Sequence, residues 1–483
     1  MAAPRARRID IPLRHVAVAC GVMLFVLLGR ATYIQVFEAA RLREDPHNQR
    51  ASTARFDRPR GEIVLRDGTV VATSRPSDGR HRYRRFYPGG PVHAPVTGHL
   101  SFYGATGVEQ AEDAVLSGND PRATVRSIMG GTPARATVRL TIDGRAQRAA
   151  YAGLRTTGRP GAAVALDPAT GAILAMASHP SYDPNAYTTP DPAELDRTDR
   201  RLQTDPRGPL LNRAIRRTYP PGSVFKIVTA AAALSSGGYR PGTEVAAPPV
   251  LRLPGASALL RNFRGSACGN GLPPLSYAFK VSCNTPFALL GVKLGQDALR
   301  EQAEAFGFNA ADLAIPLPVA RSVYPAGMDR AQTAMSALGQ FDDRATPLML
   351  AMISAAVAAD GVLMRPYLVQ EVRLGDGTVV REAEPSRYRR ALGRRDAARL
   401  TAMMTGVTRP GGTGRAAAIP DVEVAAKTGT AENAGRDHAV FTGFAPAREP
   451  RVAVAVLVEG GGSGGRVAAP IAKEIMQAVL GTG

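Results

Sequence analysis

A serine and a lysine lie three residues apart in the segment Tyr219-Pro-Pro-Gly-Ser-Val-Phe-Lys-Ile, at Ser223 and Lys226. The prolines and the glycine predict a turn that leads into a helix, on which residues three apart share a face. A serine hydroxyl becomes a strong nucleophile when a base takes its proton, and a lysine is such a base only while it is neutral. Because the neighbouring residues are apolar, we expect burial to disfavour the charged amine. The pair therefore predicts acyl transfer through Ser223, unless Ser223 only caps the helix and Lys226 is solvated.

A second segment with suitable chemistry is Val281-Ser282-Cys283-Asn284, which follows a helix predicted over 274–280. Ser282 can accept and donate a proton, and Asn284 presents both a carbonyl and an NH₂ group. These side chains suit a proton relay and a contact to a substrate amide. The segment could also serve only to cap a helix predicted over 285–294, because asparagine is a favourable N-cap residue.

A third segment, Ala426-Lys427-Thr428-Gly429-Thr430, is typical of a strand at the edge of a site. Lys427 would add a second positive charge that keeps Lys226 neutral. The Thr428 and Thr430 hydroxyls can bind a carboxylate, and Gly429 leaves room for a substrate against the strand. A basic edge strand can also simply prevent aggregation. The chain has only five lysines, however, so chance is a poor explanation for two of them lying in these segments.

The order S-x-x-K, S-x-N and K-T-G is the signature of penicillin-binding proteins and class A β-lactamases. The chain resembles class B penicillin-binding proteins, and its pattern is most similar to actinomycete members. The resemblance implies that Ser223 is acylated by a peptide ending in D-alanyl-D-alanine and that Lys226 is its base. It also implies that Ser282 and Asn284 relay protons and hold the substrate amide, and that the backbone N–H groups of Ser223 and Thr430 form the oxyanion hole.

The chain differs from class A β-lactamases in the residues after S-x-N. Those enzymes carry a water-activating glutamate in an E-x-x-L-N loop, whereas Glu301 and Glu304 here belong to a predicted amphipathic helix. We therefore expect penicillin to acylate Ser223 and to remain attached.

Apolar runs at both ends of the catalytic region predict a single sheet. They cover residues 163–166, 172–177, 422–430, 439–445 and 452–459, and a mostly helical block lies between them from residue 223 to about residue 409. A final helix is predicted over 469–480, after a glycine-rich turn over 460–465. By resemblance, residues 160–483 form an α+β transpeptidase domain, with a five-stranded antiparallel sheet, helices on both faces and a helical subdomain.

Residues 38–155 resemble the β-rich N-terminal pedestal, or dimerisation-type, domain of the same family. Arg60, Gly61, Arg66 and Gly68 match its box R-G-x-x-x-D-R-x-G, and residues 104–109 match its box G-x-x-G-x-E. Leu65 replaces the usual aspartate, which puts the internal salt bridge of this module in question. The region is too short for a glycosyltransferase domain, so we expect cross-linking without glycan polymerisation.

The N-terminus combines a basic tail over residues 1–15 with an apolar stretch over 16–37, which is long enough to cross a membrane. No small-residue cleavage site follows, so we favour a retained single-pass anchor over a cleaved signal peptide. We expect a cytoplasmic N-terminus and an extracytoplasmic catalytic domain. Cys268 and Cys283 could pair there, but Cys283 fits equally well as a small buried side chain, so the pairing stays open.

The formal net charge is +19, but no nucleic-acid motif accompanies it, so we expect no nucleic-acid partner. The resemblance implies no cofactor and no metal. The expected partners are stem peptides ending in D-Ala-D-Ala, β-lactams, the membrane and a SEDS-type glycan polymerase. The leading interpretation is a peptidoglycan D,D-transpeptidase. The alternatives are a D,D-carboxypeptidase, which uses water as the acceptor, and a β-lactam sensor or division scaffold with little turnover.

Overall fold

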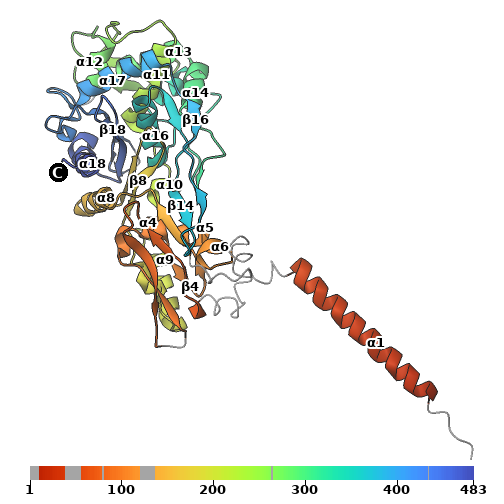
Figure 1. The fold of residues 1–483 in the computed structure, drawn as a ribbon. Coiled ribbons are helices and arrows are strands. Elements are labelled where there is room, and N and C mark those ends of the chain that lie inside the picture. The colour runs from red at the N-terminus through yellow and green to blue at the C-terminus, as the bar shows by residue number, and fades with distance from the viewer. Residues whose placement is uncertain are drawn as a thin grey trace, which may run out of the picture.

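The computed structural model describes residues 10–38, 56–78, 81–119, 136–262, 265–432 and 435–482. Figure 1 shows a smaller β-rich part, which we call the pedestal, beneath a larger catalytic part that contains the C-terminus. The pedestal is built on a six-stranded sheet with the order β15-β14-β6-β1-β2-β3. Its strands are β1 (Glu62–Val64), β2 (Val70–Pro76), β3 (Tyr83–Phe86), β6 (Thr137–Leu140), β14 (Val369–Arg373) and β15 (Val379–Glu382).

Strand β14 comes from the middle of the catalytic region, yet it pairs antiparallel with β6 and so completes the pedestal sheet (Figure 1). The pedestal also contains the short elements η2 (Gly90–Val92), α4 (Ala94–Thr97), β4 (Leu100–Ser101), β5 (Gly104–Ala105), α5 (Gly107–Ala111) and α6 (Asp113–Leu116). The chain therefore crosses between the two parts more than once.

A buried ion-pair network ties the pedestal together. Arg60 Nε and Arg85 Nε each lie 2.6 Å from a carboxylate oxygen of Glu109, whose side chain is fully buried. Arg60 also contacts Asp113 at 2.7 Å. Leu65, which stands where the family has aspartate, lies in the hydrophobic core. The pedestal therefore has an internal ion-pair network around Glu109 that does not involve position 65.

The catalytic part has the five-stranded antiparallel sheet predicted from the apolar runs, in the order β17-β18-β19-β7-β8. Its strands are β7 (Gly161–Leu166), β8 (Ile173–His179), β17 (Ala425–Ala431), β18 (His438–Ala445) and β19 (Val452–Val458). Nearly every residue of β7, β18 and β19 is buried, because helices cover both faces. The predicted α+β architecture is confirmed.

Helices α8 (Gly144–Thr156) and α18 (Gly464–Leu480) pack on one face of this sheet and on each other. Helix α8 lies on the pedestal side of the boundary predicted near residue 156, but it contributes Ala146, Ala150 and Leu154 to the core of the catalytic sheet. Helix α18 begins five residues earlier than predicted, so the end of the glycine-rich turn belongs to its first turn.

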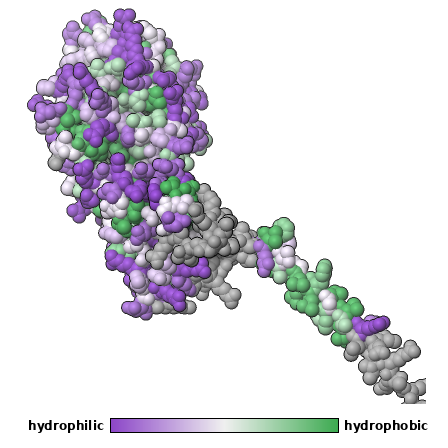
Figure 2. All heavy atoms as spheres, in the orientation of Figure 1, coloured by the Kyte–Doolittle hydropathy of each residue, from purple (hydrophilic) through white to green (hydrophobic). Residues whose placement is uncertain are grey.

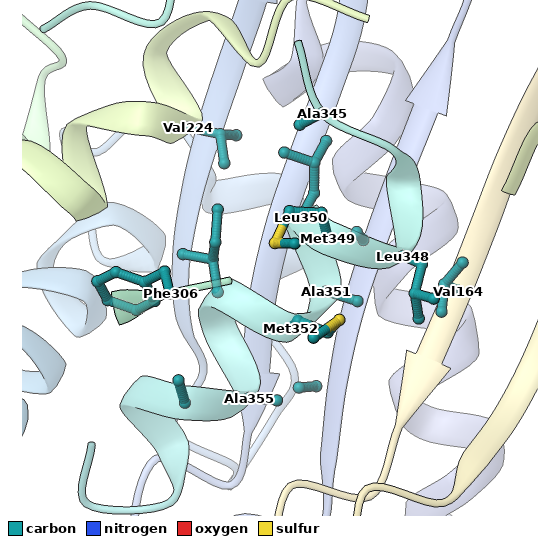
Figure 3. Packing of buried hydrophobic residues seen from close by; sticks show 14 of the residues in the cluster. Val164, Val224, Phe306, Ala345, Leu348, Met349, Leu350, Ala351, Met352 and Ala355 are labelled. Atoms are coloured by element: carbon teal, nitrogen blue, oxygen red, sulfur yellow. The ribbon is translucent and has the colours of Figure 1, made fainter. Parts of the chain in front are cut away.

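Helix α16 (Pro347–Ala358) packs on the opposite face of the sheet and is buried almost all round. In Figure 3, Leu348 lies beside Val164 of β7, whereas Val224 and Phe306 lie on the other side of the helix. Helix α16 therefore joins the sheet to the helical subdomain. The further helices are η3 (Pro184–Tyr187), α9 (Pro192–Thr204), α10 (Arg213–Arg216), η4 (Gly222–Phe225), α11 (Lys226–Ser235), α12 (Leu275–Lys280), α13 (Thr285–Leu294), α14 (Gln296–Ala305), α15 (Arg330–Ser336), α17 (Arg394–Thr408) and η6 (Arg415–Ala417).

Three two-stranded antiparallel sheets complete the catalytic part: β9 (Val250–Arg252) with β10 (Leu259–Arg261), β11 (Ala314–Ile315) with β12 (Leu317–Pro318), and β13 (Val362–Met364) with β16 (Arg387–Arg390). Beside the first of these sheets, Cys268 and Cys283 form a disulfide across 15 residues. The sequence had left this pairing open.

The N-terminal helix α1 (Asp10–Tyr33) continues as the π-helix η1 (Ile34–Glu38). Residues 14–38 are long and apolar enough to cross a membrane, with a mean hydropathy of 1.9. Figure 2 shows mainly apolar residues on the visible face of this helix. The described residues thus contain one candidate membrane span, at the position that the sequence predicts.

Candidate active site

The nucleophile candidate Ser223 lies in a single 3₁₀ turn, η4, which leads directly into α11. Gly222 has a φ of 55°, in the left-handed region, and a Cβ at this position would lie 2.8 Å from the carbonyl oxygen of Thr430. Glycine is therefore needed both for the turn and for its close approach to β17. The structure agrees with the prediction of a turn and a helix, except that the first helical turn is 3₁₀ and not α.

Lys226 is fully buried at the start of α11 and points toward the loop between α12 and α13. Its Nζ donates hydrogen bonds to Ser282 O at 2.9 Å, Cys283 O at 2.9 Å and Asn284 Oδ1 at 2.8 Å. Asn284 stands at the N-cap position of α13 without a side-chain capping bond, so its amide serves Lys226 instead. Among the described residues, the Ser223 hydroxyl forms no hydrogen bond; such contacts often tighten only when substrate binds.

Ser282 connects the two lysines. Its hydroxyl accepts a hydrogen bond from Lys427 Nζ at 2.8 Å and lies 3.4 Å from Lys226 Nζ. The backbone of Ser282 has a φ of 63°, which is uncommon for a residue other than glycine and costs about 1–3 kcal/mol. The Lys427 contact and the disulfide at the adjacent Cys283 hold this conformation.

Burial works against the charged form of both lysines. Burial, followed by the positive charge of Lys427, lowers the pKa of Lys226 well below its ordinary value. Burial also lowers the pKa of Lys427 to about 7. The directions of both effects agree with the roles that the sequence predicted for burial and for a second cation.

A cavity of about 230 Å³ lies at the meeting point of the three segments. Its lining includes six of the eight predicted site residues: Ser223, Ser282, Asn284, Thr428, Gly429 and Thr430. Lys226 and Lys427 are buried beside it. The structure therefore brings together all eight residues that the sequence predicted, from segments about 200 residues apart.

Sequence reasoning missed several residues that line the same cavity. Thr413 forms a 2.6 Å hydrogen bond with the Thr428 hydroxyl, and so orients it. Thr413 lies in the glycine-rich segment between α17 and η6, which has no recognised motif. Glu432 and Asp437 also line the cavity, beyond the end of β17. Their acidic character in a Gly-rich, strand-connecting region was the only signal available in the sequence.

A second group of residues, which sequence reasoning also missed, holds the segment just before Ser223 in place. Tyr219, four residues before Ser223, donates a hydrogen bond to Glu459 at 2.8 Å. The same carboxylate pairs with Arg213 at 2.9 Å and with Arg217 at 3.3 Å. This contact ties the chain before the nucleophile to the end of β19.

Family comparison agrees with this geometry. Residues 161–477 match the family model described as the penicillin binding protein transpeptidase domain. The chain belongs to the penicillin-binding-protein transpeptidase family. Residues 60–136 match a second model, the penicillin binding protein A dimerisation domain, which corresponds to most of the pedestal before β6.

Individual members of the family are similar over nearly the whole chain. The peptidoglycan D,D-transpeptidase PbpA of Mycolicibacterium smegmatis is 45% identical, with 98% of this chain and 99% of that protein covered. PbpA of Mycobacterium tuberculosis is 42% identical over 97% and 98% of the two chains. A solved structure of penicillin-binding protein A from M. tuberculosis as a ceftriaxone acyl-enzyme has a TM-score of 0.85 and 40% identity, and covers 89% of this chain and 100% of that chain.

The penicillin G acyl-enzyme of the same M. tuberculosis protein has a TM-score of 0.83 and 41% identity, over 88% of this chain and 100% of that chain. Members of the penicillin-binding-protein family thus share both parts of the fold with this chain, and the similar M. tuberculosis protein forms covalent complexes with β-lactams.

Proposed function

We propose that the protein is a serine D,D-transpeptidase that cross-links peptidoglycan through an acyl-enzyme on Ser223, and that β-lactams acylate the same hydroxyl. The observation that carries this proposal is the convergence of Ser223, Lys226, Ser282 and Lys427 around one cavity. A buried lysine with a lowered pKa, three residues from a serine, suits nucleophilic catalysis because it can take the serine proton once it is neutral.

In the first half-reaction, Lys226 Nζ turns toward Ser223 and takes its proton as the oxygen attacks the carbonyl of the penultimate D-alanine. The backbone N–H groups of Ser223 and Thr430 hold the oxyanion. The C–N bond then breaks, and Ser282 passes a proton from Lys226 to the departing D-alanine amine. The Thr428 and Thr430 hydroxyls bind the terminal carboxylate of the substrate.

In the second half-reaction, the amine of a neighbouring stem peptide attacks the Ser223 ester. Lys226 accepts the proton of this amine and returns a proton to Ser223 as the ester bond breaks. Water would give a carboxypeptidase or a β-lactamase instead, and Glu301 and Glu304 are poor activators for it. They lie on α14, outside the cavity lining, and Glu304 is paired with Arg300 at 2.9 Å.

A covalent labelling experiment tests this function. A fluorescent penicillin should label the full-length protein on the peptide that contains Ser223. The label should persist for many minutes because the glutamates that follow S-x-N, Glu301 and Glu304, lie outside the cavity lining. The Ser223→Ala variant provides the matched control and should carry no label. Rapid loss of label with release of hydrolysed penicillin, or equal labelling of the alanine variant, would contradict the proposal.

We further propose that residues 16–37 anchor the protein as a single pass, with residues 1–15 in the cytoplasm and the catalytic part outside. The apolar character of residues 14–38 supports this placement. In intact spheroplasts, added protease should cut the catalytic part and leave the N-terminal tail protected. Recovery of mature protein with an N-terminus beyond residue 30 would show that the helix is a cleaved signal.

The pedestal is proposed as the docking surface for a SEDS-type glycan polymerase in the same membrane. Its match to a dimerisation domain supports a role in association. Cross-linking from residues engineered into α5 or α6 should then capture the polymerase in membranes. Capture from α8 instead would place the partner on the catalytic part.

A further inference from the structure

The glycine-rich loop between β19 and α18 separates two hollows. Ser463, Gly464 and Gly465 line the active-site cavity. Gly461, a few residues earlier, lines a second hollow of about 340 Å³, together with Arg466, at the outer side of the loop. Gly461 and Ser463 are two residues apart and consecutive Cα atoms are about 3.8 Å apart, so the edges of the two hollows lie close together.

Three arginines converge on this second hollow: Arg159, Arg436 and Arg466. A Cβ on Gly460 would lie 3.1 Å from Nη1 of Arg159, and a Cβ on Gly462 would lie 3.8 Å from Nη2 of Arg436. Two guanidinium groups therefore lie against the same three-residue turn.

Hydrogen bonds fix the turn and the strand entrance that carries Arg436. Gly460 N donates to His438 Nδ1 at 3.1 Å, and Gly462 N donates to the Asp437 carbonyl at 2.8 Å. Gly460 and Gly462 both have positive φ values, of 59° and 77°, so their lack of a side chain permits the turn and leaves room for the arginines. The arginine positions are thus built into the fold.

Three arginines and one glutamate line the hollow, so its charged residues are mainly basic. Glu474 is the one acidic residue among those that line it, and it forms no ion pair with another described residue. The nearby Glu459 is already engaged by Arg213, Arg217 and Tyr219. Arg159 and Arg466 have no ion-pair partner among the described residues. Several arginines around one hollow favour the binding of an anion there, and the planar guanidinium suits a carboxylate in particular.

We propose that Arg159, Arg436 and Arg466 form a binding subsite for a carboxylate of the acyl-acceptor peptide, beside the active-site cavity. The inference rests on the transpeptidase function proposed above. The donor peptide already has a place for its terminal carboxylate at Thr428 and Thr430, whereas the acceptor strand needs its own attachment next to the Ser223 ester. An extended peptide rises about 3.3 Å per residue, so a stem peptide of a few residues spans the loop.

Binding to a catalytically inactive protein tests the subsite without turnover. The full-length Ser223→Ala protein in detergent is titrated with a labelled acceptor peptide that lacks D-Ala-D-Ala, either with free carboxylates or with every carboxylate amidated. The free-acid peptide should bind at least about tenfold more tightly, as expected for charge-assisted hydrogen bonds. Adding Arg159→Gln and Arg466→Gln together should remove that preference, and Arg436→Gln alone should reduce it.

Arg451→Gln is the matched control, because Arg451 is exposed and lies outside the hollow, and this variant should keep the full preference. Equal affinity for the two peptides, or a preference that survives the double substitution, would overturn the subsite. Inorganic phosphate that binds through these arginines without competing with the free-acid peptide would overturn the assignment to the acceptor. Penicillin labelling of the wild-type protein tests the proposed function separately, so the two failures are distinguishable.

Discussion

Replacing Lys226 with alanine is expected to lower the rate of acylation by penicillin about 10²–10⁴-fold, the usual contribution of a positioned general base. The reason is that Lys226 is a buried amine three residues from Ser223, and burial and the charge of Lys427 lower its pKa. Stopped-flow fluorescence with a fluorescent penicillin measures the rate. Lys473→Ala, on α18 and outside the cavity lining, should acylate like the wild type.

An acylation rate within a factor of about ten of the wild type would mean that another base acts.

The pH dependence of the acylation rate tests the predicted coupling between Lys226 and Lys427. Removing its charge with Lys427→Ala should raise the pKa of Lys226, because one of the two effects that lower it is lost. More of Lys226 is then protonated at a given pH, so the acid limb of the acylation profile should move to higher pH. An unmoved limb would show that the two amines are not coupled.

Replacing Glu109 with alanine is expected to destabilise the pedestal by about 3–5 kcal/mol, because it removes the buried carboxylate that two buried arginines share and leaves Arg85 without a counter-charge. Arg60 and Arg85 both contact this carboxylate at 2.6 Å. Urea unfolding of the full-length protein in detergent, followed by protease sensitivity of the pedestal, measures the loss.

Asp113→Ala is the matched control for Glu109. Asp113 also pairs with Arg60, but its side chain is 33% exposed, so its removal should cost roughly 1 kcal/mol or less. Equal losses for the two variants would show that burial does not govern the strength of the network.

The stability of the wild-type protein at acid pH provides a further test of the Glu109 network. Burial opposes ionisation of Glu109, but the charges of Arg85 and Arg60 outweigh it and lower its pKa below the ordinary 4.5.

Because the folded-state pKa of Glu109 is the lower one, its stabilisation is present above about pH 4.5 and is lost as the pH falls through the folded-state value. Glu109→Ala should therefore reduce the difference in stability between neutral and acid conditions. A variant with the same acid sensitivity as the wild type would assign that sensitivity to other carboxylates.

The order and chemistry of the three motifs were sufficient to predict the eight site residues. Ser223 and Lys226 are three residues apart, and the helical period alone places them on one face. Lys427 to Thr430 belong to the strand-like run over 422–430, which predicts a strand. The five sheet strands followed in the same way, because long apolar runs bounded by turn residues have few other solutions.

The tertiary structure decided the contacts that cross the chain. Nothing near Glu109 in the sequence indicates that Arg60 and Arg85 share its carboxylate. Strand β14 joins the pedestal although the chain has already entered the catalytic part.

Contacts between distant parts of the chain also shape the active site and its rim. The Thr413 hydroxyl reaches Thr428 from a loop without a motif, and Arg159 meets Arg436 across 277 residues at a glycine turn. Local periodicity determines which face of an element is buried, because it depends on backbone geometry within a few residues. Which side chains meet across that buried face depends on how the elements pack, and packing is a property of the whole chain.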